Sequence, residues 1–183
     1  GADTIVFAIG SGAQTITLAS NLDTITDQVT IDGWTQTGFT SNPLIRVDGN
    51  GVATTGIRFS STADNSIVRG LVLTRFTGDG IRVDTGADGI TVRGNWIGTT
   101  GTGSSGVGNG DDGIDLRGSL AVIGGTGPND RNVITNNVDE GIDIVGSGVT
   151  GHLIQGNYIG LDPDGSTNNG LGDVGIAIIS GTG

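Results

Sequence analysis

The feature that most constrains this fold is an internal repeat, in which a glycine-rich stretch returns 62 residues later. The two copies are Gly94–Leu116 (GNWIGTTGTGSSGVGNGDDGIDL) and Gly156–Ile178 (GNYIGLDPDGSTNNGLGDVGIAI), and they align without a gap. Repeated units of this kind bury their apolar faces against their neighbours. The repeat therefore predicts a stacked, solenoid-like architecture.

Three kinds of short apolar run alternate along the chain between Gly, Asn and Asp residues. They predict β-strands, because period-two alternation bounded by turn-forming residues is typical of strands. The runs cover 71–73, 95–97, 132–134 and 157–159 (first kind), 57–59, 81–83, 114–116, 142–144 and 176–178 (second kind, Gly-Ile-x-apolar), and 67–70, 91–94, 122–125 and 153–156 (third kind, ending in Gly). Near the N-terminus we expect Ile5–Phe7 to be a first-kind run, Ile16–Leu18 a second-kind run and Val29–Gly33 a third-kind run.

The spacing of these runs predicts one all-β domain over residues 1–183, folded as a three-sided parallel β-helix. Third-kind runs recur every 24 to 37 residues, which suits one turn of three strands. The chain would then form about five to six turns, stacked about 4.8 Å apart. We expect no significant helix, because Gly, Asp, Asn and Thr dominate a chain that has no Lys or Met.

Period two also assigns the faces of the strands. In second-kind runs the apolar residues, such as Ile114 and Leu116, would point inward, and Asp115 outward. In first-kind runs we expect an inner column of apolar residues (Phe7, Val47, Leu73, Ile97, Ile134 and Ile159). The asparagines at 95, 132 and 157 would form a second inner column and satisfy their buried amides by hydrogen bonds from turn to turn.

These motifs resemble the right-handed parallel β-helix of the pectate-lyase-like class. The resemblance is carried by VTIDG (29–33), GNWIG (94–98), GNGDDGI (108–114), NVITNN (132–137) and GNYIG (156–160). The chain is most similar to glycine-rich repeats of large secreted or surface proteins of bacteria, which implies a secreted or cell-surface location. Such folds host lyases, hydrolases, epimerases, adhesins and structural stalks, so the resemblance leaves the activity open.

The net charge of −11 argues against nucleic acid and anionic membrane surfaces as partners, because like charges repel. No apolar run is long enough to cross a membrane, so we expect no membrane insertion. The charge permits cations, neutral glycans or a basic partner, and a polysaccharide or cell-surface glycan is the partner that we expect.

Two aromatic residues mark the first candidate site. Trp96 and Tyr158 take the outward position of first-kind runs, and each precedes a long loop, 99–112 or 161–174. One interpretation is an aromatic platform that stacks on sugar rings. The other, which loop length favours, is that each loop folds over its own aromatic and shields it from water.

The second long loop carries a candidate metal site. Asp162, Asp164 and Asn168 supply oxygen atoms of the kind that calcium prefers. The alternative is an Asp-Gly turn without metal, which the sequence favours because the first loop has threonines at both aspartate positions. No cofactor is required by this interpretation, and calcium is the one that the loop would accommodate.

Charged residues on other runs give further hypotheses. Arg69 and Arg93 occupy equivalent outward positions on third-kind runs and would bind an acidic sugar unless carboxylates compensate them. Asp111-Asp112 resembles the acidic pair of polygalacturonase-like hydrolases, but an acid before Gly recurs at this corner, which favours a structural role. For His152, the single histidine, a structural role is also favoured.

The sequence thus predicts a non-catalytic, rod-like structural, adhesive or glycan-binding module of a secreted or surface protein. We expect it to be a segment of a longer solenoid with end-to-end contacts to adjacent segments. The alternative is a polysaccharide-active lyase, hydrolase or epimerase with a shallow site on the outer face of the β-helix.

Overall fold

The computed structural model describes residues 2–170 and 172–179 and consists of short strands with no α-helix in these residues. A single turn of 3-10 helix, η1 (Gly33–Thr35), interrupts them. The strands are β1 (Asp3–Val6), β2 (Gln14–Thr17), β3 (Val29–Asp32), β4 (Ile45–Asp48), β5 (Ile57–Phe59), β6 (Ile67–Arg69), β7 (Leu71–Thr74), β8 (Ile81–Val83), β9 (Thr91–Arg93), β10 (Trp96–Ile97), β11 (Ile114–Leu116), β12 (Val122–Gly124), β13 (Val133–Ile134), β14 (Ile142–Val145), β15 (Leu153–Gln155), β16 (Tyr158–Ile159) and β17 (Ile176–Ile179).

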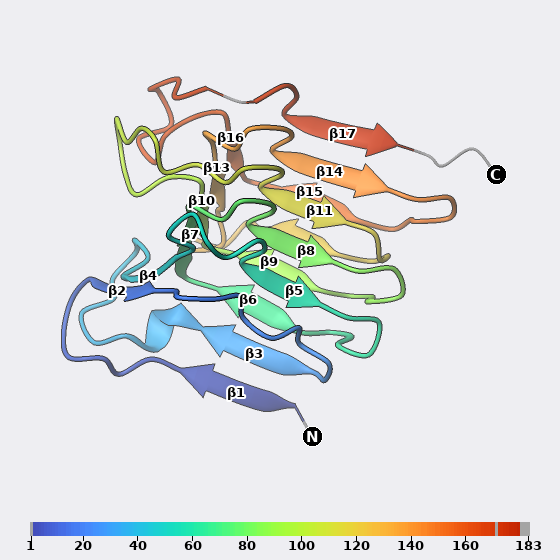
Figure 1. Cartoon of the computed structure of the whole chain (residues 1–183), viewed down its shortest axis with the longest axis horizontal. Helices are drawn as coiled ribbons and strands as arrows, with labels where there is room; N and C mark the ends of the chain where they lie inside the picture. The colour runs from blue at the N-terminus through green and yellow to red at the C-terminus, as the bar shows by residue number, and fades with distance from the viewer. Residues whose placement is uncertain (1, 171, 180–183) are drawn as a thin grey trace.

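The strands form three parallel sheets, which we name after their outward side chains. The arginine sheet has the order β1-β3-β6-β9-β12-β15, the aromatic sheet β2-β4-β7-β10-β13-β16, and the acidic sheet β5-β8-β11-β14-β17. From β3 on, the chain visits the arginine, aromatic and acidic sheets in turn, so the strands stack in rows from β1 at one end to β17 at the other (Figure 1). This arrangement is consistent with a three-sided parallel β-helix.

The N-terminal strands correct one prediction. Ile5 lies in the arginine sheet opposite Ile31, whereas its run was expected in the aromatic sheet. Ile16 lies in the aromatic sheet opposite Val47, whereas its run was expected in the acidic sheet. The acidic sheet is continued here only by an isolated bridge from Ile25 to Phe59. The physical reason is that these runs lack the Gly-Asn and Gly-Ile punctuation, and alternation alone does not distinguish three equivalent sheets.

The predicted inner faces are otherwise confirmed along the middle of the chain. Ile81, Ile114 and Ile142 are fully buried in one column of the acidic sheet, and Ile97 and Ile134 in one of the aromatic sheet. Phe7, expected in that aromatic-sheet column, instead follows β1 and packs against the edge of the core. On β17, Ile176 and Ile178 are exposed, because no further described strand covers them.

The asparagine column is confirmed as a ladder of hydrogen bonds. The Nδ2 of Asn95 donates to Oδ1 of Asn132 at 3.2 Å, and the Nδ2 of Asn132 donates to Oδ1 of Asn157 at 3.0 Å. Asn95 and Asn132 have no exposed surface. A second ladder was not predicted from the sequence: Nδ2 of Asn109 donates to Oδ1 of Asn137 at 2.9 Å. Both ladders tie neighbouring turns together where the chain bends between sheets.

Candidate functional site

The aromatic sheet carries one outward column, in which residues from successive strands lie side by side. The column is Thr15, Arg46, Val72, Trp96, Val133 and Tyr158. The loops cover much of it, so both valines are buried, whereas Trp96 and Tyr158 stay partly exposed.

Trp96 stands between two small pockets on this face. One, of about 170 Å³, extends toward Arg46 and Thr100. The other, of about 120 Å³, is lined by Asn42, Asn129 and Arg131 together with Trp96, Ser41, Pro128, Val133 and Pro163. An indole between two pockets with amide and guanidinium groups offers a flat apolar surface beside hydrogen-bond donors, which is how amphipathic ligands are recognised.

Arg131 differs from the other seven arginines. Each of those has a carboxylate oxygen within 4.0 Å, whereas Arg131 has none among residues 2–170 and 172–179. Its Nε donates to the carbonyl oxygen of Gly156 at 2.9 Å, and its guanidinium lies 4.0 Å from the centre of the Tyr158 ring. In a chain of net charge −11, a cation at a pocket that has no anionic partner in the described part of the chain is a feature that folding alone does not require.

The two predicted aromatics therefore play different parts. A Cβ added to Gly165 would lie 2.6 Å from the Tyr158 ring, so the long loop of Tyr158 packs directly on it. In the corresponding loop of Trp96, a Cβ added to Gly101 would lie 4.0 Å from the ring, so this glycine packs less closely on its aromatic. The structure thus shields Tyr158 between its loop and Arg131 and leaves Trp96 at two pockets. Sequence reasoning missed Arg131, because whether an arginine has a carboxylate partner depends on the neighbouring turns.

Arg69 and Arg93 lie in the arginine sheet and not on the face of Trp96. They are register neighbours, and their guanidinium groups lie 4.4 and 5.5 Å from the ring centre of Trp34, which sits on η1. Arg69 pairs with Asp32 at 2.6 Å, and Arg93 pairs with Asp130 at 3.6 Å. Internal carboxylates therefore compensate both charges.

The predicted calcium loop forms a hydrogen-bonded turn. Asp162 is fully buried, and its oxygens accept from the backbone N–H of Gly103 at 2.6 Å and from Nδ2 of Asn169 at 2.9 Å. Asp164 accepts from the backbone of residues 166 and 167 and from the Thr167 hydroxyl, which together lower the pKa of this carboxyl to about 2. Asn168 accepts from the backbone of residue 170. N–H and O–H donors thus reach the oxygens that the calcium interpretation assigns to a cation.

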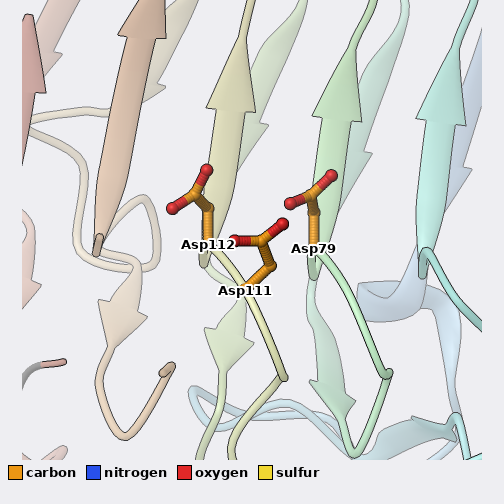
Figure 2. Close-up of side chains that lie close together, drawn as sticks. All are labelled: Asp79, Asp111 and Asp112. Carbon is orange, nitrogen blue, oxygen red and sulfur yellow. The ribbon is translucent and has the colours of Figure 1, made fainter. Parts of the chain in front are cut away.

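Carboxylates gather instead on the outer face of the acidic sheet. Asp79 precedes β8, and Asp111 and Asp112 precede β11 on the neighbouring turn; Figure 2 shows the Asp111 carboxylate between the other two. These three residues each offer an oxygen within 4.8 Å of the others. Asp112 also belongs to two further sets whose oxygens lie within 4.8 Å of one another. One contains Asp115 and Asp143, and the other contains Asp139 and Glu140.

Burial and mutual repulsion shift the protonation of this cluster. Burial, followed by the charges of Asp115 and Asp111, raises the pKa of Asp79 to about 6, against the opposing effect of Arg82. Burial likewise raises the pKa of Asp112 well above its usual range, although the backbone N–H of Glu140 donates to its Oδ1 at 3.0 Å and favours the charged form. The cluster therefore holds protons at pH values where isolated aspartates are ionised.

A cavity of about 650 Å³ borders this cluster at the corner between the aromatic and acidic sheets. Its lining includes Arg75, Asn136 and Val138, and Gly110, which directly precedes Asp111. Arg75 is held by a bidentate pair with Asp48 at 2.7 Å. The corner is open here because loops 74–79 and 135–140 are short where their neighbours are long.

His152 has a structural role in this arrangement. Its Nδ1 accepts from the backbone N–H of Ala121 at 3.2 Å, and burial lowers the pKa of the imidazole. The neutral form that accepts this bond is therefore favoured.

No protein-family model, curated protein or solved structure is significantly similar to this chain. Among the described residues there is no helix long and apolar enough to cross a membrane.

Proposed function

We propose that this chain is a non-catalytic, rod-like module that binds acidic polysaccharide along its aromatic sheet. In this proposal the fold is a right-handed, pectate-lyase-like β-helix of about five to six turns and belongs to a longer solenoid of a secreted or cell-surface protein. The three parallel sheets and the two asparagine ladders support the architecture.

One observation carries the binding proposal: Trp96 lines a pocket together with Arg131, which has no carboxylate partner among the described residues. Trp96 and Arg131 line the same pocket, with the polar side chains of Asn42 and Asn129 beside them. An indole face stacks on the apolar face of a sugar ring, and a guanidinium forms paired hydrogen bonds with a carboxylate. The chemistry fits a polysaccharide that contains uronic acid, provided its chain follows the exposed column and avoids the acidic sheet.

The test measures binding of polygalacturonate oligosaccharides by titration calorimetry. Arg131→Gln is expected to weaken binding about tenfold or more, because a charge-assisted hydrogen bond contributes about 1.5–3 kcal/mol. Trp96→Ala is expected to weaken it by a similar factor, and Trp96→Phe to retain most of it because an aromatic face remains.

Arg58→Gln is the matched control. Arg58 is an exposed arginine on the acidic sheet, paired with Asp84 at 2.8 Å, so its loss removes the same charge at another face. Equal weakening by Arg58→Gln and Arg131→Gln would reduce the effect to net charge and refute the site. Shortened or unsaturated products in the same incubation would replace the binding module by the alternative, a polysaccharide-active enzyme.

We also propose that adjacent solenoid turns cover the apolar end near β1. An apolar cavity of about 170 Å³ is lined there by Ile5, Leu22 and Ile31 together with Phe7, Ile16, Leu18, Val47, Ile57 and Leu71. The exposure of Ile5 and Leu22 supports this contact, because unpaired strand edges and bare cores favour stacking.

A further inference from the structure

The acidic cluster contains one oxygen that no group in the described residues satisfies. Asp79 is 4% exposed, and its Oδ1 is buried without a hydrogen-bond partner. Its other oxygen lies 3.6 Å from Nη1 of Arg82, which is too long for a good hydrogen bond. Figure 2 shows the Asp79 carboxylate facing that of Asp111. A buried carboxylate oxygen directed at further carboxylates is costly unless a cation or a proton lies between them.

The set around Asp79 is more available to a ligand than the set that contains Asp115. Both oxygens of Asp115 accept from Nε of Arg117, at 3.1 and 2.9 Å, and Nη1 of Arg82 lies 3.0 Å from its Oδ2. The oxygens of Asp115 are therefore already paired with two arginines. Asp112 is anchored through one oxygen by the backbone of residue 140, which fixes its direction. Asp111 is exposed, so the set Asp79, Asp111 and Asp112 opens to solvent at one side.

We propose that Asp79, Asp111 and Asp112 together bind one calcium ion on the outer face of the acidic sheet. Their oxygens lie within 4.8 Å of one another, close enough for one ion with metal–oxygen distances of about 2.4 Å to contact all three. Three carboxylates supply hard ligands, and waters fill the remaining positions on the side of Asp111. Magnesium fits less well, because it requires near-ideal octahedral geometry at about 2.1 Å.

The charges around this set agree with a bound cation. The charges of Asp115 and Asp111 repel that of Asp79, whereas Arg82, 3.6 Å away, and the backbone of Asp112 favour its charged form. This site is independent of the polysaccharide proposal and lies on a different sheet, and it also differs from the calcium loop around Asp162 that the sequence suggested.

The test is equilibrium dialysis of the chelator-treated protein against radioactive calcium at pH 7.5. The wild type is expected to bind one calcium ion. Asp111→Asn is expected to weaken binding at least about tenfold, since even losing an outer partner of a metal ligand costs 10–100-fold. This variant changes an exposed side chain without altering its size, so folding is expected to be retained.

Asp164→Asn is the matched control in the alternative loop and is expected to leave calcium binding within about twofold of wild type. The proposal is overturned if the wild type binds no calcium. It is equally overturned if Asp164→Asn abolishes binding while Asp111→Asn does not, because the ion would then occupy the long loop. Asp79→Asn provides a second readout: a folded variant that binds calcium like the wild type would also refute the site.

Discussion

Removing Asn132 from the ladder is expected to destabilise the fold strongly. Its Nδ2 donates to the carbonyl oxygen of Val92 at 2.8 Å and to Oδ1 of Asn157 at 3.0 Å. Its Oδ1 accepts from the backbone N–H and from Nδ2 of Asn95, at 2.9 and 3.2 Å. Asn132→Ala would leave the backbone N–H of Asn95 buried without that partner and open a cavity at a fully buried position.

The expected loss follows from these contacts. Each buried group left without a partner costs about 1–3 kcal/mol, and the cavity adds to this. Alternative partners remain for Nδ2 of Asn95, which also donates to Val68, so the loss does not scale with all four bonds. We expect a decrease of about 3–5 kcal/mol in the free energy of unfolding, a large share of the roughly 5–15 kcal/mol of a typical domain.

Urea unfolding followed by circular dichroism measures this loss. Asn132→Leu is the informative companion, because it fills the volume without restoring the hydrogen bonds and is expected to remain destabilised. The exposed Asn42 is the control, and Asn42→Ala is expected to change stability by less than about 0.5 kcal/mol. A loss below about 1 kcal/mol for Asn132→Ala, or full stability in Asn132→Leu, would show that the ladder does not hold the turns together.

Two further outcomes are expected. The folded-state pKa of Asp79 is raised to about 6, so the folded chain keeps a proton that the unfolded chain loses near pH 4. Without calcium, unfolding free energy should therefore fall as pH rises from about 4.5 to 7, with a smaller fall in Asp79→Asn; a rise over this window would contradict the assignment. A Cβ at Gly108 would lie 1.8 Å from the carbonyl oxygen of Asn136, whereas one at Gly103 meets nothing within 4 Å. In thermal melts Gly108→Ala should thus lose far more stability than Gly103→Ala, which bears only the positive-φ strain of about 1–2 kcal/mol, and equal losses would refute the close packing.

Much of the architecture could be predicted from the sequence, because Gly-Asn and Gly-Ile recur at the starts of strands in successive turns. The Asn95 ladder followed from the spacing of three asparagines, and the inner column through Ile114 followed from alternation. The assignment failed at Ile5 and Ile16, where strands without that punctuation are told apart only by the turn they pair with.

The candidate sites were less accessible to sequence reasoning. Whether an arginine has a carboxylate partner is a property of neighbouring turns, so Arg131 could not be distinguished from Arg69. The acid-before-glycine motif around Asp112 is visible in the sequence. That it places oxygens of Asp79 beside those of Asp111 and Asp112 follows only from the stacking of the two turns. For Asp162 the sequence shows the acidic neighbours, whereas the N–H groups of Gly103 and Asn169 that donate to its oxygens are identified only in the folded chain.

Because covalent bonds and strand-pairing hydrogen bonds run in different directions in this fold, the chain should tolerate a cut in a loop. The polypeptide runs around the axis, whereas the ladder hydrogen bonds, such as those between β10 and β13, run along it. A protease nick in the outward loop after β10, for instance between Ser105 and Gly106, would sever the backbone without breaking a pair of strands. The two fragments would remain docked and could be produced separately and mixed, so this loop is a natural place for a split-protein complementation pair or an inserted domain.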